Sequence, residues 1–323
     1  MSRLISTLWA PDGLFAGWPP AVLDPAGPYA GSIAVLTWVL FAIALLVLAV
    51  VGTALWIALW GKQRTRQRLG GSRLIWIAGI AFPVVVLTLL LVYGLRLTSS
   101  LSAGTGPRTD LRIRVTGEMW WWRVAYLDAE GRVVSWDANE LHIPVGRTVE
   151  LELESADVIH SFWVPRLSGK TDMIPGRRNL IKIQADAPGV YAGQCAEYCG
   201  GPHALMGFVV IAQPPADFAR FMRAASHPAA PPPSPGRQLF ETAGCAACHR
   251  IAGTPANGME GPDLTLLGRR RTLGAGILPN NHGTLMGWIG DSQAIKPGNR
   301  MPPFSMLSSA ELDALATYLE QRK

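Results

Sequence analysis

Two long hydrophobic runs without a charge lie near the start of the chain. Residues 32–60 form a run of 29 positions, and residues 74–95 form a second run that contains Pro83. About 20 apolar residues suffice for a helix to cross a bilayer, and a proline kinks such a helix without excluding it. A buried core helix of a soluble domain would be shorter. We therefore predict a two-helix transmembrane hairpin with aromatic residues near its ends, namely Trp56, Trp60, Trp76 and Tyr93.

After Asp110 the pattern changes to short runs in which apolar and polar residues alternate with period two. This alternation is typical of half-buried strands bounded by turns. Many short, evenly spaced strands indicate a small antiparallel sandwich or barrel. The strands that we expect are Leu111–Val115, Trp120–Tyr126, Glu140–Ile143, Thr148–Leu153, Asn179–Ile183 and Gly207–Ile211.

A proline-rich stretch follows the β-patterned region. His227–Pro235 has five prolines in nine residues, which predicts an extended, semi-rigid spacer of ~3.1 Å per residue. Near the C-terminus, Ser308 and Glu311 form a capping box before an amphipathic run. We expect the resulting helix to pack against an earlier one near Gly236–Phe240.

Charge placement orients the predicted hairpin. The formal net charge is +6, only 16% of the residues are charged, and no acidic residue occurs between Pro25 and Thr109. The loop 61–73 carries only basic charges, so the positive-inside rule places it in the cytoplasm and both termini outside. Because the basic excess belongs to membrane orientation, nucleic acid is excluded as a partner. Residues 1–30 fit a cleaved signal peptide poorly.

Four potential metal ligands occur within twelve residues: Cys195, Cys199, His203 and Met206. Thiolate, imidazole and thioether together are typical of a copper electron-transfer site, in which methionine is the weak ligand. A second thiolate allows two coppers to share both sulfurs, and His160 is the candidate for a further nitrogen. A Cys195–Cys199 disulfide and a structural zinc site are the alternatives, although zinc has no use for a thioether.

The C-terminal region carries the attachment motif for a c-type haem. Cys245 and Cys248 are the two thiols, and His249 is the proximal ligand. The proline- and glycine-rich stretch around Met301 supplies the candidate distal ligand, with Met306, Met286 and His282 as competitors. We interpret Arg269–Arg271 as a solvated run of charges rather than as partners of a haem propionate.

Taken together, the chain resembles subunit 2 of haem–copper cytochrome c oxidases. The resemblance rests on the two spans, Trp120–Trp122, the stretch His160–Gly176 and the loop Cys195–Met206. It implies a cupredoxin sandwich with a dinuclear CuA centre in which Cys195 and Cys199 bridge the coppers and His160, His203 and Met206 are terminal ligands. It further implies that Glu197 ligates through its carbonyl and faces a magnesium site, and that electrons enter through Trp120. The haem module resembles all-α class I cytochromes c.

The order of the modules is similar to that of a caa3-type oxidase. The resemblance implies a membrane-anchored multidomain protein of the bacterial inner membrane. It would pass electrons from cytochrome c, or from a bc1-type complex, through haem c and CuA to subunit 1, which reduces oxygen and pumps protons; subunit 3 is a further expected partner. A CuA/haem c subunit of a nitric oxide reductase and a membrane copper-delivery protein are the rival hypotheses. This chain itself should not reduce oxygen.

The expected divisions are an N-terminal exoplasmic segment (1–31), the hairpin (32–97), the CuA domain (98–213), a linker (214–235) and the cytochrome c domain (236–323). Three departures from the family limit what the resemblance implies. Arg73 lies where many members have a glutamate that feeds a proton channel, and Met119 precedes Trp120 where glutamine is common. Residues 1–30 contain no cysteine, so we expect no lipid anchor there.

Overall fold

The computed structural model describes residues 21–101, 109 and 111–323. The chain divides into two compact units, one formed by residues 31–106 and the other by residues 1–30 and 107–323. The expectations for the N-terminal segment therefore lie largely outside the described residues. Its described end runs along the second unit, where Ala26 donates to the Arg166 carbonyl at 2.8 Å.

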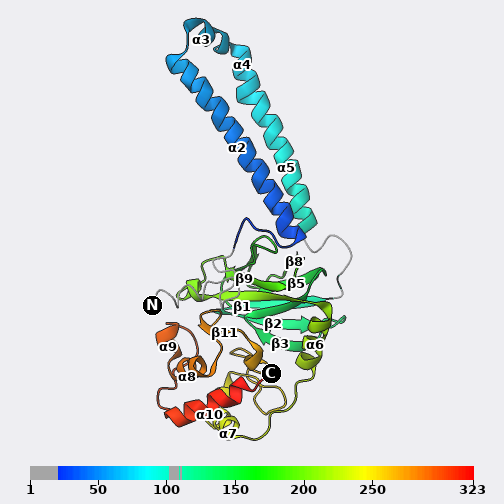
Figure 1. Cartoon of the computed structure of the whole chain (residues 1–323), viewed down its shortest axis with the longest axis vertical. Coiled ribbons are helices and arrows are strands. Elements are labelled where there is room, and N and C mark those ends of the chain that lie inside the picture. The colour runs from blue at the N-terminus through cyan, green and yellow to red at the C-terminus, as the bar shows by residue number, and fades with distance from the viewer. Residues whose placement is uncertain (1–20, 102–108, 110) are drawn as a thin grey trace. The chain divides into compact units, whose positions relative to one another are not determined.

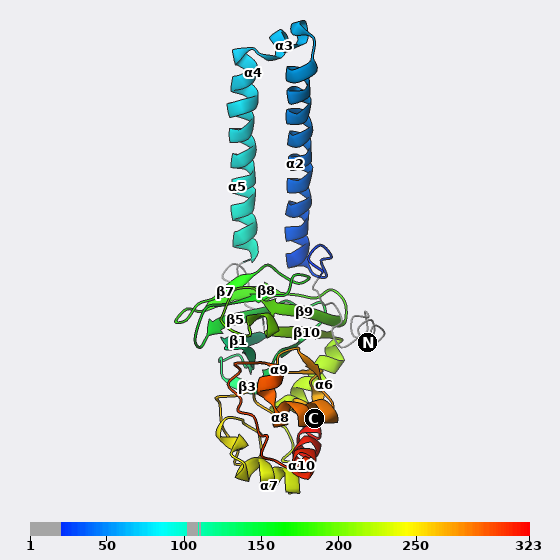
Figure 2. The same cartoon turned by 90° about the vertical axis from the view of Figure 1, so that its left-hand side faces the viewer.

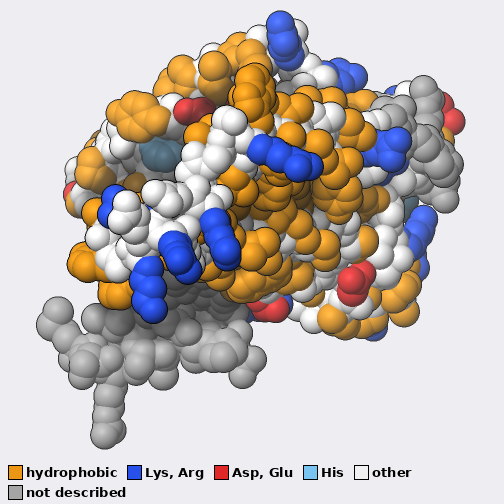
Figure 3. All heavy atoms as spheres, turned by 90° about the horizontal axis from the view of Figure 1, so that it is seen from above, with side chains coloured by type: hydrophobic (Ala, Val, Ile, Leu, Met, Phe, Trp, Pro, Cys, Tyr) orange, Lys and Arg blue, Asp and Glu red, His pale blue; other side chains and the backbone are white. Residues whose placement is uncertain are grey.

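The first unit is the predicted helical hairpin (Figures 1 and 2). Helix α2 spans Pro28–Trp60, and the return rod consists of α4 (Ser72–Trp76), a π-helical turn (Ile77–Ala81) and α5 (Phe82–Leu101). Both rods are long and apolar enough to cross a membrane. Their apolar side chains stand exposed in this chain, as for Leu48 at 67%, so lipid or partner helices must cover them. Seen from the loop end in Figure 3, orange apolar side chains lie among blue Lys and Arg side chains.

Two details of the hairpin differ from the sequence pattern. The basic loop contains a short helix, α3 (Gln63–Leu69), because its Gln, Arg and Leu residues are good helix formers. Directly before Pro83 the second rod widens into the π-helical turn. Proline has no N–H to donate to the preceding turn, and a π-bulge is a common way for a helix to absorb that loss.

The β-region of the second unit is a sandwich of two five-stranded sheets, with strand orders β3-β2-β1-β5-β8 and β4-β10-β9-β6-β7. The all-β cupredoxin sandwich is thus confirmed, but the expected purely antiparallel pairing is wrong. β1 runs parallel to β5, and β10 runs parallel to β4. Alternation of side chains along a strand shows which face is buried, but it does not determine the direction of a neighbour distant in sequence. The strands are β1 (Arg112–Glu118), β2 (Trp121–Leu127), β3 (Val133–Ala138), β4 (Glu140–Pro144), β5 (Val149–Ser155), β6 (His160–Trp163), β7 (Thr171–Met173), β8 (Asn179–Ile183), β9 (Gly189–Cys195) and β10 (Gly207–Gln213).

The aromatic core of the sandwich adjoins His160, whose ring centroid lies 6.3 Å from that of Trp122. Trp122 is fully buried and meets Phe162 edge-on at 6.0 Å and Phe208 at 4.8 Å between ring centroids. Such aromatic pairs add packing energy beyond the apolar area that they bury. Because β6 and β10 carry Phe162 and Phe208, the same residues fix the strands that flank the ligands.

The region expected as a linker from residue 214 begins as a helix, α6 (Pro215–Ser226). Its buried residues Phe218, Phe221 and Ala225 follow helical spacing, and they belong to the hydrophobic core of the sandwich. Only residues 227–234, between α6 and α7, run without a helix or strand. The extended segment thus agrees with the spacer predicted at His227–Pro235, whereas the wider linker range from residue 214 includes α6.

The remaining residues form a helical module with its own core, as predicted. Its helices are α7 (Pro235–Thr242), α8 (His282–Gly290), α9 (Ser292–Ile295) and α10 (Ser309–Glu320), and a two-stranded ribbon pairs β11 (Thr272–Leu273) with β12 (Leu278–Pro279). The capping box of Ser308 and Glu311 is confirmed. Helix α10 packs on α7, as expected. A Cβ on Gly236 would meet the Ala314 carbonyl oxygen at 2.0 Å, so only glycine allows this approach.

The helical module contacts the sandwich through buried charges. Arg270 lies against Asp137, with Nε 2.8 Å from Oδ1, and both side chains are buried. Glu140 accepts the backbone N–H groups of Arg271 and Thr272 at 2.6 and 3.2 Å. The expectation that Arg269–Arg271 form a solvated run is therefore wrong for Arg270, because the Asp137 carboxylate pairs with its guanidinium inside the interface.

Candidate metal centres

The four clustered ligand candidates lie on the loop that joins β9 to β10. β9 ends at Cys195, β10 begins at Gly207, and the loop contains one 3₁₀ turn at His203–Leu205. The antiparallel register pairs Gln194 with Gly207, and Cys195 N–H donates to the Met206 carbonyl at 3.0 Å. The two ends of the loop are thus fastened together, which folds the ligand side chains into one cluster.

Cys199 is the centre of that cluster. Its Sγ lies 3.7 Å from Cys195 Sγ, 3.5 Å from His203 Nδ1 and 3.8 Å from Met206 Sδ. A disulfide would require about 2.05 Å between the sulfurs. Both cysteines are free thiols, so the disulfide alternative is wrong for this structure.

His160 joins the cluster from the neighbouring strand β6. The register pairs Phe162 with Cys195, and His160 Nδ1 lies 3.8 Å from Cys195 Sγ. Its ring is fully buried, and Nε2 lies 2.8 Å from Asp157 Oδ1. A carboxylate on the outer nitrogen fixes the tautomer of a ligating histidine and leaves the other nitrogen for the metal. Asp157 therefore orients His160 toward the sulfurs.

Glu197 presents two different groups. Its backbone carbonyl oxygen lies 3.2 Å from Cys195 Sγ, on the ligand side of the loop. Its carboxylate points away and pairs with Lys170, whose Nζ also lies 3.1 Å from Asp172. The carbonyl is thus placed as the family resemblance implies, whereas the carboxylate is engaged by a lysine within this chain.

The two thiols are coupled through the contact between their sulfurs. The hydrogen bond with Cys199 lowers the pKa of Cys195 to about 3, against the opposing effect of burial. The same hydrogen bond and burial raise the pKa of Cys199. The lowered pKa of Cys195 favours its thiolate, which is the form of cysteine that binds a metal.

These residues fit a dinuclear copper site. Three sulfur atoms and two imidazole nitrogens form a series of contacts. His160 lies next to Cys195, Cys195 lies next to Cys199, and Cys199 lies next to both His203 and Met206. The ligand atoms of His160, Cys195 and Cys199 all lie within 4.8 Å of one another, and the three residues are buried. Thiolates, imidazoles and a thioether are the donors that copper prefers, whereas zinc sites rarely use a thioether.

Of the three consecutive tryptophans, Trp120 contacts the ligand loop. Its indole Nε1 donates to the Cys199 carbonyl at 2.9 Å. Trp122 is a core residue, and Trp121 lies under the Arg123 guanidinium at 4.8 Å. Trp120 is thus the member of the run that is hydrogen-bonded to the loop of candidate ligands.

The haem candidates surround His249. Its Nδ1 lies 2.8 Å from the Pro262 carbonyl, which can only accept, so Nδ1 carries the proton and Nε2 is left to bind iron. Burial lowers the pKa of His249, which favours the neutral, ligating form. A Cβ on Gly261 would lie 2.7 Å from the ring Cε1, so glycine makes room for the ring. Cys245 and Cys248 are free thiols, so these residues fit an attached haem.

The loop around Met301 is held by its own side chains. Asn299 accepts from Met301 N–H at 2.8 Å, and the Met301 carbonyl accepts from Ser292 and Gln293. Met301 packs against the core of the helical module, as does Met286. Two competitors are disfavoured as the distal haem ligand. Met306 is 77% exposed. Both ring nitrogens of His282 are engaged, one by Asp313 and the other by Glu320.

Several charged residues around these sites were not predicted from the sequence. Asp157 gave no signal beyond its place three residues before His160. Asp137 and Glu140 lie in runs that read as ordinary strand. Lys296 lies in the proline- and glycine-rich stretch before Met301, and nothing in that composition indicates that its side chain is 3% exposed.

Comparison with known proteins finds relatives that cover most of the chain. Residues 127–213 match the family model described as cytochrome c oxidase subunit II, periplasmic domain, and residues 233–323 match the cytochrome c model. Cytochrome c oxidase subunit 2 of Alkalihalophilus pseudofirmus is 35% identical over 93% of this chain and 90% of its own length. The subunit of Bacillus sp. strain PS3 is 30% identical over 81% of this chain and 78% of its own length. The periplasmic domain of subunit II from Bradyrhizobium japonicum, a crystal structure, is 32% identical over 37% of this chain and 95% of that chain, with a TM-score of 0.35.

The fold and the donor set define a membrane-anchored electron-transfer protein with one copper module and one haem module. The similarity over nearly the whole chain identifies the family: the chain belongs to the cytochrome c oxidase subunit 2 family, with the fused cytochrome c of the caa3 type. It is the electron-input subunit of a terminal oxidase, and it associates with the catalytic oxidase subunits. The nitric oxide reductase and copper-delivery hypotheses are not favoured by these relatives.

Proposed function

We propose that Cys195 and Cys199 bridge the two coppers of a CuA centre. His160, His203, Met206 and the Glu197 carbonyl then complete its ligand set. The observation that carries this proposal is the position of Cys199 Sγ, within 3.8 Å of a second thiol, an imidazole nitrogen and a thioether. When bound, a copper pair of this kind supplies one-electron transfer. The chain contributes a buried cluster in which Asp157 holds one histidine in a fixed orientation.

We infer a covalent haem c on Cys245 and Cys248, with His249 and Met301 as its axial ligands. The contact that supports this assignment is the one between His249 Nδ1 and the Pro262 carbonyl, since it leaves Nε2 available to iron. The haem domain corresponds to residues 236–323 and the copper domain to residues 98–213. Electrons pass from a cytochrome c or a bc1-type donor to the haem, next to the copper pair, and then to the catalytic subunit.

We further propose that the complete assembly is a proton-translocating oxidase with subunits 1 and 3. This chain supplies electrons and does not itself reduce oxygen. The basic loop 61–73 lies in the cytoplasm, and both soluble domains lie on the periplasmic side of a bacterial inner membrane. A magnesium site at the interface with subunit 1 would require Glu197 to exchange Lys170 for the metal.

The test is EPR and optical spectroscopy of the purified chain before and after Cys199→Ser. We expect a mixed-valence copper spectrum and a c-type haem band in the parent, and loss of the copper spectrum alone in the variant. Cys248→Ser is the matched control, because it should leave copper intact and weaken covalent haem attachment. A parent protein with haem but no mixed-valence copper spectrum would refute the bridging-thiolate assignment.

A further inference from the structure

Lys296 is a buried lysine at the junction of the two soluble domains, which belong to one compact unit. It follows α9 and precedes Met301 by five residues. Burial lowers the pKa of Lys296 to about 7. A buried ammonium group is costly unless all of its protons are hydrogen-bonded, so its surroundings must compensate for the lost hydration.

Three backbone carbonyls supply that compensation. Lys296 Nζ donates to Trp120 at 2.7 Å, to Leu205 at 2.8 Å and to Gly274 at 2.9 Å. An ammonium group has three protons, and each has an acceptor here. Trp120 and Leu205 belong to the sandwich, whereas Gly274 belongs to the cytochrome c module. One side chain therefore joins three segments from two domains.

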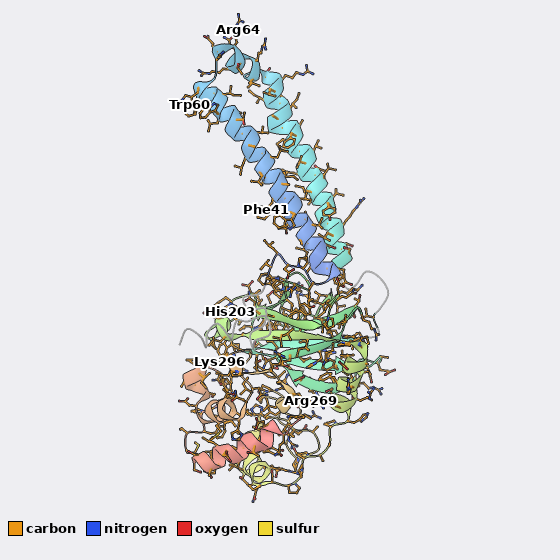
Figure 4. The ribbon with its side chains drawn as sticks, in the orientation of Figure 1. Phe41, Trp60, Arg64, His203, Arg269 and Lys296 are labelled. Carbon is orange, nitrogen blue, oxygen red and sulfur yellow. The ribbon has the colours of Figure 1, made fainter. Side chains whose placement is uncertain are left out.

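Two of the three segments adjoin the proposed copper ligands. Leu205 directly precedes the copper ligand candidate Met206, and Trp120 is hydrogen-bonded to the Cys199 carbonyl. Lys296 belongs to the same loop as Met301. In Figure 4 the labelled His203 and Lys296 lie on the same side of the unit, with Arg269 toward the other. The lysine thus connects the loop of the distal haem ligand to the loop of the copper ligands.

Further contacts lie on either side of this junction. The Gly207 N–H donates to the Ala275 carbonyl at 3.0 Å, one residue from Met206 on one side and from Gly274 on the other. The Arg270–Asp137 ion pair and the Glu140 hydrogen bonds hold the segment 270–272. Among these contacts, the hydrogen bonds of Lys296 are the ones that start from the loop containing Met301.

We propose that Lys296 is a positioning residue for haem-to-copper electron transfer, and that it holds the Met301 loop against the carbonyls of Trp120 and Leu205. The cytochrome c domain then rests docked on the copper loop instead of meeting it by diffusion. This inference rests on the proposed function above. With both groups bound, the transfer would move one electron from haem to copper, and Lys296 would contribute through position alone.

The test compares Lys296→Met with Lys323→Met in the full chain, because both remove a lysine charge but Lys323 is exposed at the C-terminus. The first readout is the rate of copper reduction after photoreduction of the haem. We expect Lys296→Met to slow it by about tenfold to a hundredfold, as a small misplacement does in positioned reactions, and Lys323→Met to leave it unchanged. Copper EPR and haem optical spectra must match the parent, so loss of either centre counts against the proposed function and not against Lys296.

The second readout is hydrogen–deuterium exchange of the peptides that contain residues 118–122, 203–207 and 272–276. Faster exchange in Lys296→Met, with parent-like spectra, is the expected result. Parent-like electron transfer and parent-like exchange in this variant would overturn the proposal.

The parent chain provides a measurement that does not depend on whether the variant folds. A docked domain transfers its electron at a rate independent of solvent viscosity, because no encounter precedes the step. A rate that falls as viscosity rises would show that the domains meet by diffusion, and it would likewise overturn the proposal.

Discussion

Asp157 Oδ1 lies 2.8 Å from Nε2 of His160, and its other oxygen accepts the Met119 backbone N–H at 2.8 Å. The carboxylate therefore connects the residue before Trp120 to the histidine that faces Cys195. This arrangement places a single acidic side chain behind both the copper cluster and the tryptophan proposed to receive electrons.

Asp157→Asn should weaken copper binding by about 10–100-fold, because the amide supports the His160 imidazole less strongly than the carboxylate does. Copper retention during dialysis against a chelator, followed by EPR, measures this effect. The haem band should not change. Asp186→Asn is the control, since Asp186 is exposed and its carboxylate accepts a hydrogen bond from Gln184 at 3.2 Å. Equal copper retention in Asp157→Asn and the parent would contradict a supporting role for Asp157.

Gly236→Ala should destabilise the cytochrome c domain by about 1–3 kcal/mol, because the added Cβ would overlap the Ala314 backbone carbonyl. Thermal unfolding followed at the haem band is the measurement. Gly287→Ala in α8 is the matched control, because a Cβ there meets nothing within 4 Å and glycine is a poor helix former. That control should gain about 0.5–1 kcal/mol. Similar shifts in the two variants would show that α7 and α10 do not pack as closely as described.

Asp137→Ala should cost about 3–5 kcal/mol, because it leaves the buried Arg270 guanidinium without its carboxylate. The double variant Asp137→Ala/Arg270→Met should recover much of that loss, since it removes both charges. Chemical denaturation of the three proteins gives the comparison. A double variant that is less stable than Asp137→Ala would indicate that Arg270 contributes through Glu140 instead.

The buried Glu140 should make the stability of the folded protein depend on pH. Burial, followed by the charge of Asp137, raises the pKa of Glu140 to about 8, although Arg270 and the N–H groups of Arg271 and Thr272 oppose this rise. The unfolded value is about 4.3. Between these values the folded protein binds the proton more strongly than the unfolded chain does. The stability contribution is therefore complete below the unfolded pKa and is lost as the pH rises through the folded pKa.

Glu140→Gln should remove this dependence, because the amide does not titrate. Thermal midpoints at pH 5, 7 and 9 give the comparison: the parent should lose more stability than Glu140→Gln as the pH rises. Parallel curves for the two proteins would contradict the assignment of the pH dependence to Glu140.

Much of the fold was predictable because its signals are local. An uncharged run long enough to span lipid, period-two alternation and the capping box of Ser308 each act within a few residues. The direction of β5 beside β1 was not predictable, since the pairing joins strands that are distant in sequence. Helix α6 was missed because Pro214, Pro215 and the prolines after residue 227 obscure the spacing of Phe218, Phe221 and Ala225.

The metal-ligand candidates were recognisable because their residue types are chemically specialised and closely spaced. The residues that support them were not, because their function depends on what they face. Asp157, Asp137 and Lys296 are common charged residues, and each acquires its role only through a partner brought by folding. Arg270 shows the same limit, since in the sequence it is the middle member of a basic run and in the structure it is a buried ion-pair partner.

Helix α6 also changes the meaning of the proline-rich segment. With α6 packed into the sandwich core, the tether to the haem domain consists of residues 227–234 alone, which span at most about 25 Å when extended. A tether of that length sets an effective concentration on the order of millimolar. The haem therefore stays within reach of the copper loop even when the interface opens, and a weak intrinsic affinity between the domains suffices. High salt, which separates a free cytochrome from its acceptor, should accordingly have little effect on this transfer.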